Sequence, residues 1–309
     1  MAAAKAKVAV IGSFAVGLTM RAERFPVAGE TLLGTDFDMG PGGKGSNQAI
    51  GAARLGADTS LLVKIGDDQF GDMALDIYKE EGVSDEHVIR TPERNTGVGF
   101  ITLNQAGENF IVLDMGANEL LTPQEVSAAK DAIAGAQVAM TVLEIPVETA
   151  TAGMRLAREE GVTTILNPAP APKAGLPDEL LANVDVLTPN QTELRILLGL
   201  PPGDAIDSLD AARQLQARGV ASVAVTRAAR GALLVPSEGQ PEEIPGIEVN
   251  VVDTTGAGDA FNAALGVALA EGQSLSEAVH FAVVAGALAC TKLGVIPALS
   301  DRAAVEARL

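Results

Sequence analysis

Most of this chain alternates between short apolar runs and longer stretches with helical spacing, and this alternation limits the fold more than any other feature. The apolar runs are hydrophobic at consecutive positions rather than at every second one, which is typical of parallel strands covered by helices on both faces. The sequence therefore predicts an α/β fold with a doubly wound, mostly parallel sheet flanked by helices. The expected strands are 7–12, 59–66, 136–144, 163–168, 184–190 and 222–235, and the expected helices are 46–57, 67–82, 148–161 and 208–219.

Two segments, residues 14–40 and 96–113, interrupt this alternation and lack long helical patterns. The second reads as a hairpin whose turn lies at Gln105-Ala106-Gly107. We expect both segments to form a small β-sheet outside the main one. Ligands of doubly wound sheets bind beyond the carboxyl ends of the strands, so the small sheet would act as a lid over that crevice. We expect residues 1–309 to form a single domain with this lid inserted in it.

Charge and residue counts exclude several classes of function. The formal net charge of −18 argues against nucleic acid or an anionic membrane as the main partner, because both require a basic surface. No apolar run is long enough to span a bilayer, and the first residues lack a signal-peptide pattern, so we expect a cytoplasmic protein. The single cysteine, Cys290, excludes an internal disulfide framework, and His87 and His280 lack the spacing of metal ligands.

The first motif is a glycine-rich stretch, GPGGKGSNQ, at residues 40–48. It is not a P-loop, because Asp38 and Gly45 stand where that motif needs glycine and Ser or Thr. Its glycines permit positive φ and a close approach of the backbone to a ligand, and Asn47 offers an amide to a polyhydroxyl compound. The alternative is a simple turn with an Asn or Ser cap. The dinucleotide fingerprint is also absent, which argues against an NAD-dependent oxidoreductase.

The second motif is DTTGAGDAF at residues 253–261, which places Asp259 where a glycine turn becomes a helix. Backbone N–H groups and the helix dipole attract anions at such a place. Asp259 either caps this helix, since Asp is a preferred N-cap residue, or performs chemistry there.

Further polar residues stand at the carboxyl ends of expected strands, which meet at one rim of a parallel sheet. Glu144 and Thr226 end two strands, and Asn190 and Glu193 follow a third. Glu144 is either solvated or positioned for hydroxyl groups. Asn190 and Glu193 have the spacing of a capping box, and they also suit a hydrated Mg²⁺ beside phosphates.

Taken together, the two motifs resemble the signatures of the ribokinase-like (PfkB) family of carbohydrate kinases. GGKGSNQA looks like the N-terminal signature and DTTGAGDAF like the C-terminal one, and FPVAGET, LNPAP, LPDELL and VDVLTPN extend the likeness over nearly the whole chain. The resemblance implies an ATP-dependent kinase that phosphorylates a primary hydroxyl of a small sugar. It also implies a β-sheet lid that often clasps a second subunit, and hence a homodimer.

The resemblance implies roles for individual residues as well. It makes Asp259 the general base, with Gly256, Ala257 and Gly258 as an anion hole. The residues implied to face the sugar are Gly42, Gly43, Lys44, Asn47 and Glu144. Those implied to face ATP and Mg²⁺ are Asn190, Glu193, Thr226, Gly231 and Gly258. Those of a monovalent-cation site, usually for K⁺, are Asp253, Thr255, Ala289, Lys292 and Gly294.

Some positions depart from the family pattern. Ala15-Val16-Gly17 stands where an Asn-x-Asp usually supplies an Asp that holds two ring hydroxyls. A buried group left unpaired costs about 1–3 kcal/mol, which argues against D-ribose unless Asp36 or Asp38 substitutes. Another pentose, a hexose or a nucleoside is the alternative acceptor. Two further departures are Ala228, which replaces a glycine of the nucleotide loop, and Ala298, which replaces a serine near the cation site.

An alternative from another class of protein is a catalytically silent regulator that binds a sugar or a nucleotide. A pure binding protein does not need a general base, so an intact Asp259 in its glycine turn favours the kinase.

Overall fold

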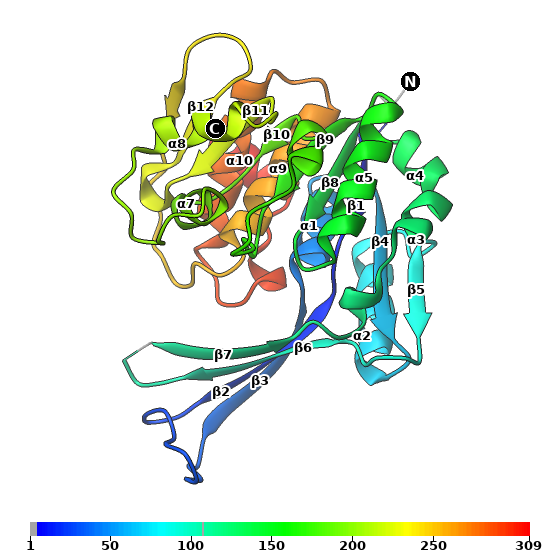
Figure 1. Ribbon diagram of the computed structural model, residues 1–309. Helices are drawn as coiled ribbons and strands as arrows, with labels where there is room; N and C mark the ends of the chain where they lie inside the picture. Colours follow the sequence, from blue (N-terminus) through cyan, green and yellow to red (C-terminus); the bar gives the residue numbers. More distant parts are fainter. Residues whose placement is uncertain (1–4, 107) are drawn as a thin grey trace.

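A nine-stranded sheet dominates the computed structural model, which describes residues 5–106 and 108–309 (Figure 1). The strand order is β13-β12-β11-β10-β9-β8-β1-β4-β5, and the seven strands from β11 to β5 are parallel. The strands are β1 (Lys7–Ile11), β4 (Asp58–Gly66), β5 (Val88–Thr91), β8 (Val138–Val142), β9 (Thr163–Asn167), β10 (Val186–Leu187), β11 (Ser222–Thr226), β12 (Ala232–Val235) and β13 (Glu242–Ile244).

Helices cover both faces of this sheet, which confirms the predicted α/β fold. In β1, Val8 and Val10 belong to one hydrophobic core, and Ala9 and Ile11 belong to the other. One layer holds α1 (Lys44–Arg54), α2 (Gln69–Glu81), α9 (Ala257–Ala270), α10 (Leu275–Ala289) and α11 (Arg302–Glu306). The other holds α3 (Pro123–Ala128), α4 (Lys130–Ala134), α5 (Val147–Glu159), α6 (Asp178–Ala182), α7 (Gln191–Leu197) and α8 (Ser208–Gln216).

The stretch 222–235 forms two antiparallel strands, β11 and β12, rather than one continuous strand. The chain reverses within a short turn, where both Ala228 (φ 51°) and Gly231 (φ 83°) have positive φ. Such backbone angles end a strand, so the apolar residues on either side pair with each other.

A separate four-stranded sheet extends from the main body, with the order β3-β2-β6-β7 (Figure 1). Its strands are β2 (Ala15–Arg21), β3 (Thr35–Gly42), β6 (Gly97–Leu103) and β7 (Asn109–Asp114), and they come from the two segments expected to form a small sheet. We call this sheet the lid. Of the expected hairpin turn, Gly107 lies outside the described residues.

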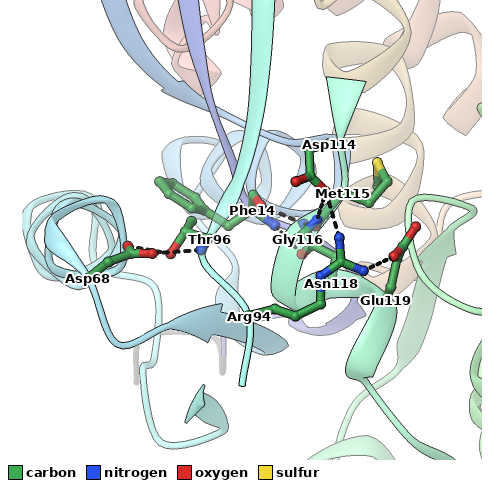
Figure 2. Close-up of polar contacts among 9 residues, drawn as sticks. All are labelled: Phe14, Asp68, Arg94, Thr96, Asp114, Met115, Gly116, Asn118 and Glu119. Atoms are coloured by element: carbon green, nitrogen blue, oxygen red, sulfur yellow. Dashed lines mark hydrogen bonds and ion pairs between the residues drawn. The ribbon is translucent and has the colours of Figure 1, made fainter. Parts of the chain in front are cut away.

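Figure 2 shows how the lid is fastened where its strands leave the main body. The side-chain amide of Asn118 accepts a hydrogen bond from the Phe14 N–H (3.0 Å) and donates one to the Phe14 carbonyl (2.7 Å), just before β2. Asp68 accepts hydrogen bonds from the N–H and the hydroxyl of Thr96 (both 2.8 Å), just before β6. Arg94 forms ion pairs with Asp114 and Glu119. These contacts fix the direction in which the lid strands leave the body.

Within residues 5–106 and 108–309, no helix has the length and hydrophobicity needed to cross a membrane.

Candidate active site

The strand order reverses between β1 and β8, so a crevice opens beyond the carboxyl ends of these two strands. Polar groups meet there. The Ser13 hydroxyl, after β1, donates to Oε2 of Glu144, after β8, at 2.6 Å. The N–H of Lys44, the first residue of α1, donates to the same oxygen at 2.8 Å. Glu144 is therefore held at the sheet edge by hydrogen bonds rather than solvated alone.

The glycines before and within α1 permit close contacts between backbone segments. Gly43 has φ 91°, and a Cβ there would lie 2.7 Å from Cα of Phe14. A Cβ on Gly45 would lie 2.3 Å from the Ser13 nitrogen. The close approach that the sequence suggested for a ligand is thus, at these two positions, an approach of α1 to the end of β1.

Asp259 does not cap α9, so the capping alternative is wrong. The N-cap is Gly256, with φ 82° and no side-chain cap. Asp259 lies in the first turn, is 5% exposed, and accepts hydrogen bonds from two amides of α1. Nδ2 of Asn47 donates to Oδ2 at 2.8 Å, and Nε2 of Gln48 donates to Oδ1 at 3.2 Å.

Four charged groups converge around this point. Burial lowers the pKa of Lys44, but the carboxylates of Asp259, Glu144 and Glu193 raise it by more, so the net shift is upward. Burial raises the pKa of Glu144 above its ordinary value, against the opposing effect of Lys44. Burial likewise raises the pKa of Glu193, against the Asn190 N–H and Lys44. One cation, Lys44, therefore interacts electrostatically with three carboxylates from separate segments of the chain.

A cleft of about 1120 Å³ lies beside this cluster. Ala257 and Gly258, at the start of α9, line it. Asn190, Thr226 and Gly231 line it as well. A Cβ on Gly258 would meet no atom within 4 Å, so packing within the chain does not require glycine there. The first N–H groups of a helix have no intrahelical partner, and the start of α9 therefore offers donors to an anion in the cleft.

Asn190 and Glu193 form the expected capping box at the start of α7. Oδ1 of Asn190 accepts from the N–H groups of Thr192 (2.9 Å) and Glu193 (2.8 Å), while Oε2 of Glu193 accepts from the Asn190 N–H (2.8 Å). The capping box uses one carboxylate oxygen of Glu193. The other oxygen is left to interact with a Mg²⁺ ion held through water.

The nucleotide loop expected after β11 is irregular. Ala228, which stands where the family has glycine, has φ 51°, a conformation that costs a residue with a Cβ about 1–2 kcal/mol. Gly231 has φ 83°, and a Cβ there would lie 2.1 Å from the Ile244 carbonyl oxygen. Gly231 is thus required by the path of the backbone, and it also lines the cleft.

The expected cation-site residues are partly brought together. Oδ1 of Asp253 accepts from the N–H (2.9 Å) and hydroxyl (2.7 Å) of Thr255, and Oδ2 accepts from the Gly294 N–H (3.1 Å). Burial raises the pKa of Asp253, but these hydrogen bonds lower it by more, so the net shift is downward. Ala289 is buried and Lys292 is exposed. A carboxylate held ionised in this way is an oxygen ligand that a cation can use. Among the described residues, no cluster of three or more His, Cys, Asp or Glu suits a metal ion.

Three residues of the site escaped the sequence argument: Ser13, Gln48 and Asn167. Each makes its contact with a residue more than 30 positions away. For Gln48, the available signal was that Ser46, Asn47 and Gln48 are consecutive polar residues at the start of an otherwise apolar helical stretch. The structure shows that all three are buried.

Comparison with known proteins extends over nearly the whole chain. The family model described as pfkB family carbohydrate kinase matches residues 5–302. The ribokinase of Staphylococcus aureus (strain COL) is 37% identical over 300 residues, which cover 96% of this chain and 98% of that protein. The deoxyribokinase of Salmonella typhi is 36% identical over 258 residues, which cover 82% of each protein.

Among solved structures, a ribokinase from Thermotoga maritima has a TM-score of 0.88 at 32% identity and covers 97% of this chain and 98% of its own. The ribokinase of Arabidopsis thaliana, solved in complex with ribose and ATP, has a TM-score of 0.90 at 30% identity and covers 98% of both chains. The likeness therefore includes the lid and the main sheet together.

Proposed function

Since this chain belongs to the pfkB family of carbohydrate kinases, we propose that it transfers the γ-phosphate of ATP to the primary hydroxyl of a small sugar. One observation carries the proposal: the buried carboxylate of Asp259 stands one residue after Gly258, where the start of α9 faces the cleft. A base for an alcohol and donors for a phosphate thus lie on the same turn of helix.

The reaction follows from these groups. The sugar hydroxyl gives its proton to Asp259 as its oxygen forms a bond to the γ-phosphorus, and the bond from this phosphorus to the bridging oxygen breaks to release ADP. The N–H groups of Gly256, Ala257 and Gly258 stabilise the charge on the transferred group. Lys44 adds a positive charge between the two substrates. Glu144 and Asn47 lie on the side proposed for the sugar, and Glu193 lies on the side proposed for the nucleotide.

The nucleotide occupies the cleft, where Thr226, Gly231 and Asn190 face it. Mg²⁺, when bound with ATP, neutralises phosphate charge, and Glu193 and Asn190 are the residues we propose to hold it through water. We propose Asp253, Thr255 and the backbone near Ala289, Lys292 and Gly294 as the K⁺ site.

One row of the lid lacks side chains at three of its four positions, and the fourth position is Leu113 of β7. Gly17 of β2 pairs with Gly40 of β3 and with Gly99 of β6, so three glycines lie in one row. A Cβ on Gly17 would meet no atom closer than 3.7 Å, and one on Gly40 none within 4 Å. Asp38, paired with Thr19, is one row further out on the same face. We infer that the glycine row leaves room for a bulkier acceptor, or for an acceptor with fewer hydroxyls facing the lid. We also infer that Asp38, rather than Asp36, is the acid placed to reach the acceptor.

The test is ADP release with Mg-ATP and K⁺ across D-ribose, 2-deoxy-D-ribose, other pentoses, hexoses and nucleosides. We expect one acceptor to raise the rate well above the background ATP hydrolysis. Rapid turnover of D-ribose would show that another group replaces the missing Asp, and Asp38→Asn would then be tested. ATP binding without turnover of any acceptor would contradict the proposal and favour a silent regulator.

We also propose that the lid pairs with the lid of a second copy of this chain. Its face opposite the glycine row carries large hydrophobic side chains. Met39, Leu18, Phe100 and Val112 are cross-strand neighbours in one row, and Met20 and Phe110 belong to the next. All but Leu18 are at least 40% exposed. A contiguous apolar face of this kind on a protruding sheet marks an interaction site.

Exchanging Phe100 for glutamate is expected to convert a dimer into a monomer, because a charge would be buried at the centre of this face. Sedimentation equilibrium measures the change. The matched control is Leu309→Glu, which alters a side chain that is also exposed but lies far from the lid in sequence, at the C-terminus. A wild-type protein that is monomeric at all accessible concentrations would contradict the pairing.

A further inference from the structure

Gln48 is a buried glutamine that reaches the carboxylate proposed as the base. Its side chain is fully buried, and both hydrogens of Nε2 have acceptors: Oδ1 of Asn167 at 3.0 Å and Oδ1 of Asp259 at 3.2 Å. The neighbouring Asn47 donates to the other oxygen of Asp259. Each carboxylate oxygen thus receives one N–H, and of about four lone-pair sites two remain for a substrate hydroxyl.

The direction of these hydrogen bonds is fixed by a backbone group. Nδ2 of Asn167, at the end of β9, donates to the carbonyl of Thr188 at 3.3 Å. A carbonyl only accepts, so the Asn167 amide must turn its nitrogen to Thr188 and its oxygen to Gln48. Gln48 must in turn direct its nitrogen to Asn167, and the same nitrogen then meets Asp259. The chain Thr188–Asn167–Gln48 therefore presents a donor, and never an acceptor, to this carboxylate.

This orientation leaves a polar atom unpaired. Oε1 of Gln48 is buried and has no hydrogen-bond partner in the described part of the chain. An unsatisfied buried acceptor is destabilising, and native proteins contain few of them. An apolar side chain of similar size would fill the same space without this cost. The amide is therefore explained better by what its nitrogen does than by packing.

We propose that Gln48 is a positioning residue, and that the chain Thr188–Asn167–Gln48 holds the Asp259 carboxylate aimed at the acceptor hydroxyl. The proposal rests on the proposed function, in which Asp259 is the base. A hydrogen bond to a charged group is stronger than one between neutral groups, so the donor limits rotation of the carboxylate. The other charged groups facing Asp259 are Lys44 from α1, Glu144 from the end of β8 and Glu193 from α7, and these are unchanged in the test.

The test replaces Gln48 with leucine, which is similar in size, and with glutamate, which keeps the shape but adds a like charge. For Gln48→Leu we expect kcat to fall about 10- to 100-fold, the usual effect of losing one hydrogen bond to a charged group. KM for Mg-ATP should change little, because the residues that face the nucleotide are not altered. Gln48→Glu should lower kcat further, because two adjacent carboxylates repel each other and Asp259 would turn away from the acceptor.

The matched control is Gln216→Leu. Nε2 of Gln216 donates to the carbonyls of Ala221, Val235 and Pro236, far from the cluster, so its loss should lower thermal stability without lowering kcat. A Gln48→Leu enzyme with the wild-type kcat would overturn the proposal while leaving the proposed function intact.

A second measurement needs no turnover. The ¹³C signal of the Asp259 carboxyl group, identified by its absence in Asp259→Asn, can be recorded by NMR at one fixed pH. We expect its chemical shift to differ between Gln48→Leu and the wild type and to be unchanged in Gln216→Leu, because Gln48, and not Gln216, donates to this carboxylate. Equal chemical shifts in Gln48→Leu and wild type would overturn the positioning role, even if no acceptor is phosphorylated.

Discussion

Asp259→Asn is expected to lower kcat by about 10²- to 10⁴-fold, because the acceptor hydroxyl loses the group that takes its proton. The asparagine side chain has nearly the same shape, and the cleft residues that face the nucleotide are untouched, so Kd for Mg-ATP should stay close to the wild-type value. Steady-state kinetics and calorimetric titration with ATP measure the two quantities.

Asp301→Asn provides the control for this exchange. Asp301 caps α11 by accepting from the Ala304 N–H, and asparagine is an equally good N-cap, so activity and stability should both be kept. A thermal unfolding curve of Asp259→Asn is needed as well, since its new NH₂ group faces a donor from Asn47 or Gln48. A folded Asp259→Asn protein with undiminished turnover would exclude Asp259 as the base.

Lys44→Met is expected to lower kcat by about 10²- to 10³-fold, the range seen when one group that stabilises transition-state charge is removed. The carboxylates of Asp259, Glu144 and Glu193 raise the pKa of Lys44. Burial raises the pKa of Glu144 and of Glu193, and the charge of Lys44 lowers it. Without this charge, the pKa of each glutamate should rise further. Protonation would then begin at higher pH, and the acid limb of the kcat–pH profile should move upward.

The control is Lys64→Met, which removes another lysine with a largely buried side chain. Lys64 pairs with Glu125 at 2.7 Å and donates to the Leu120 carbonyl, away from the carboxylate cluster. This exchange should reduce stability and spare turnover. If Lys44→Met kept the wild-type kcat and pH profile, the charge of Lys44 would have no part in the transfer.

The fold was predictable where the local pattern and the tertiary structure agree. Residues 8–11 of β1 are apolar at every position because Val8 and Val10 face one core while Ala9 and Ile11 face the other. The stretch 222–235 shows the limit of this argument. Its apolar residues read as continuous, but Ala228 adopts a positive φ that is unusual for alanine, and the chain reverses there.

The site was predictable only in part. Asp259, Lys44, Asn47 and Glu144 meet as the motifs implied, because each stands at a strand end or helix start of one sheet edge. Whether Asp259 would cap its helix could not be decided from sequence, since the capping geometry depends on the left-handed Gly256. The role of Gln48 depends on Asn167, which is 119 positions away, and no local pattern encodes that contact.

Transfer to a primary hydroxyl with Asp259 as the base is tested most directly by the structure of the product. Proton-coupled ³¹P NMR of the phosphorylated acceptor shows which carbon bears the phosphate. We predict a phosphomonoester whose phosphorus couples to the two protons of a CH₂ group, formed by the wild type and not by Asp259→Asn at the same enzyme concentration. A phosphate on a ring hydroxyl, or inorganic phosphate as the sole product, would contradict transfer to a primary hydroxyl with Asp259 as the base.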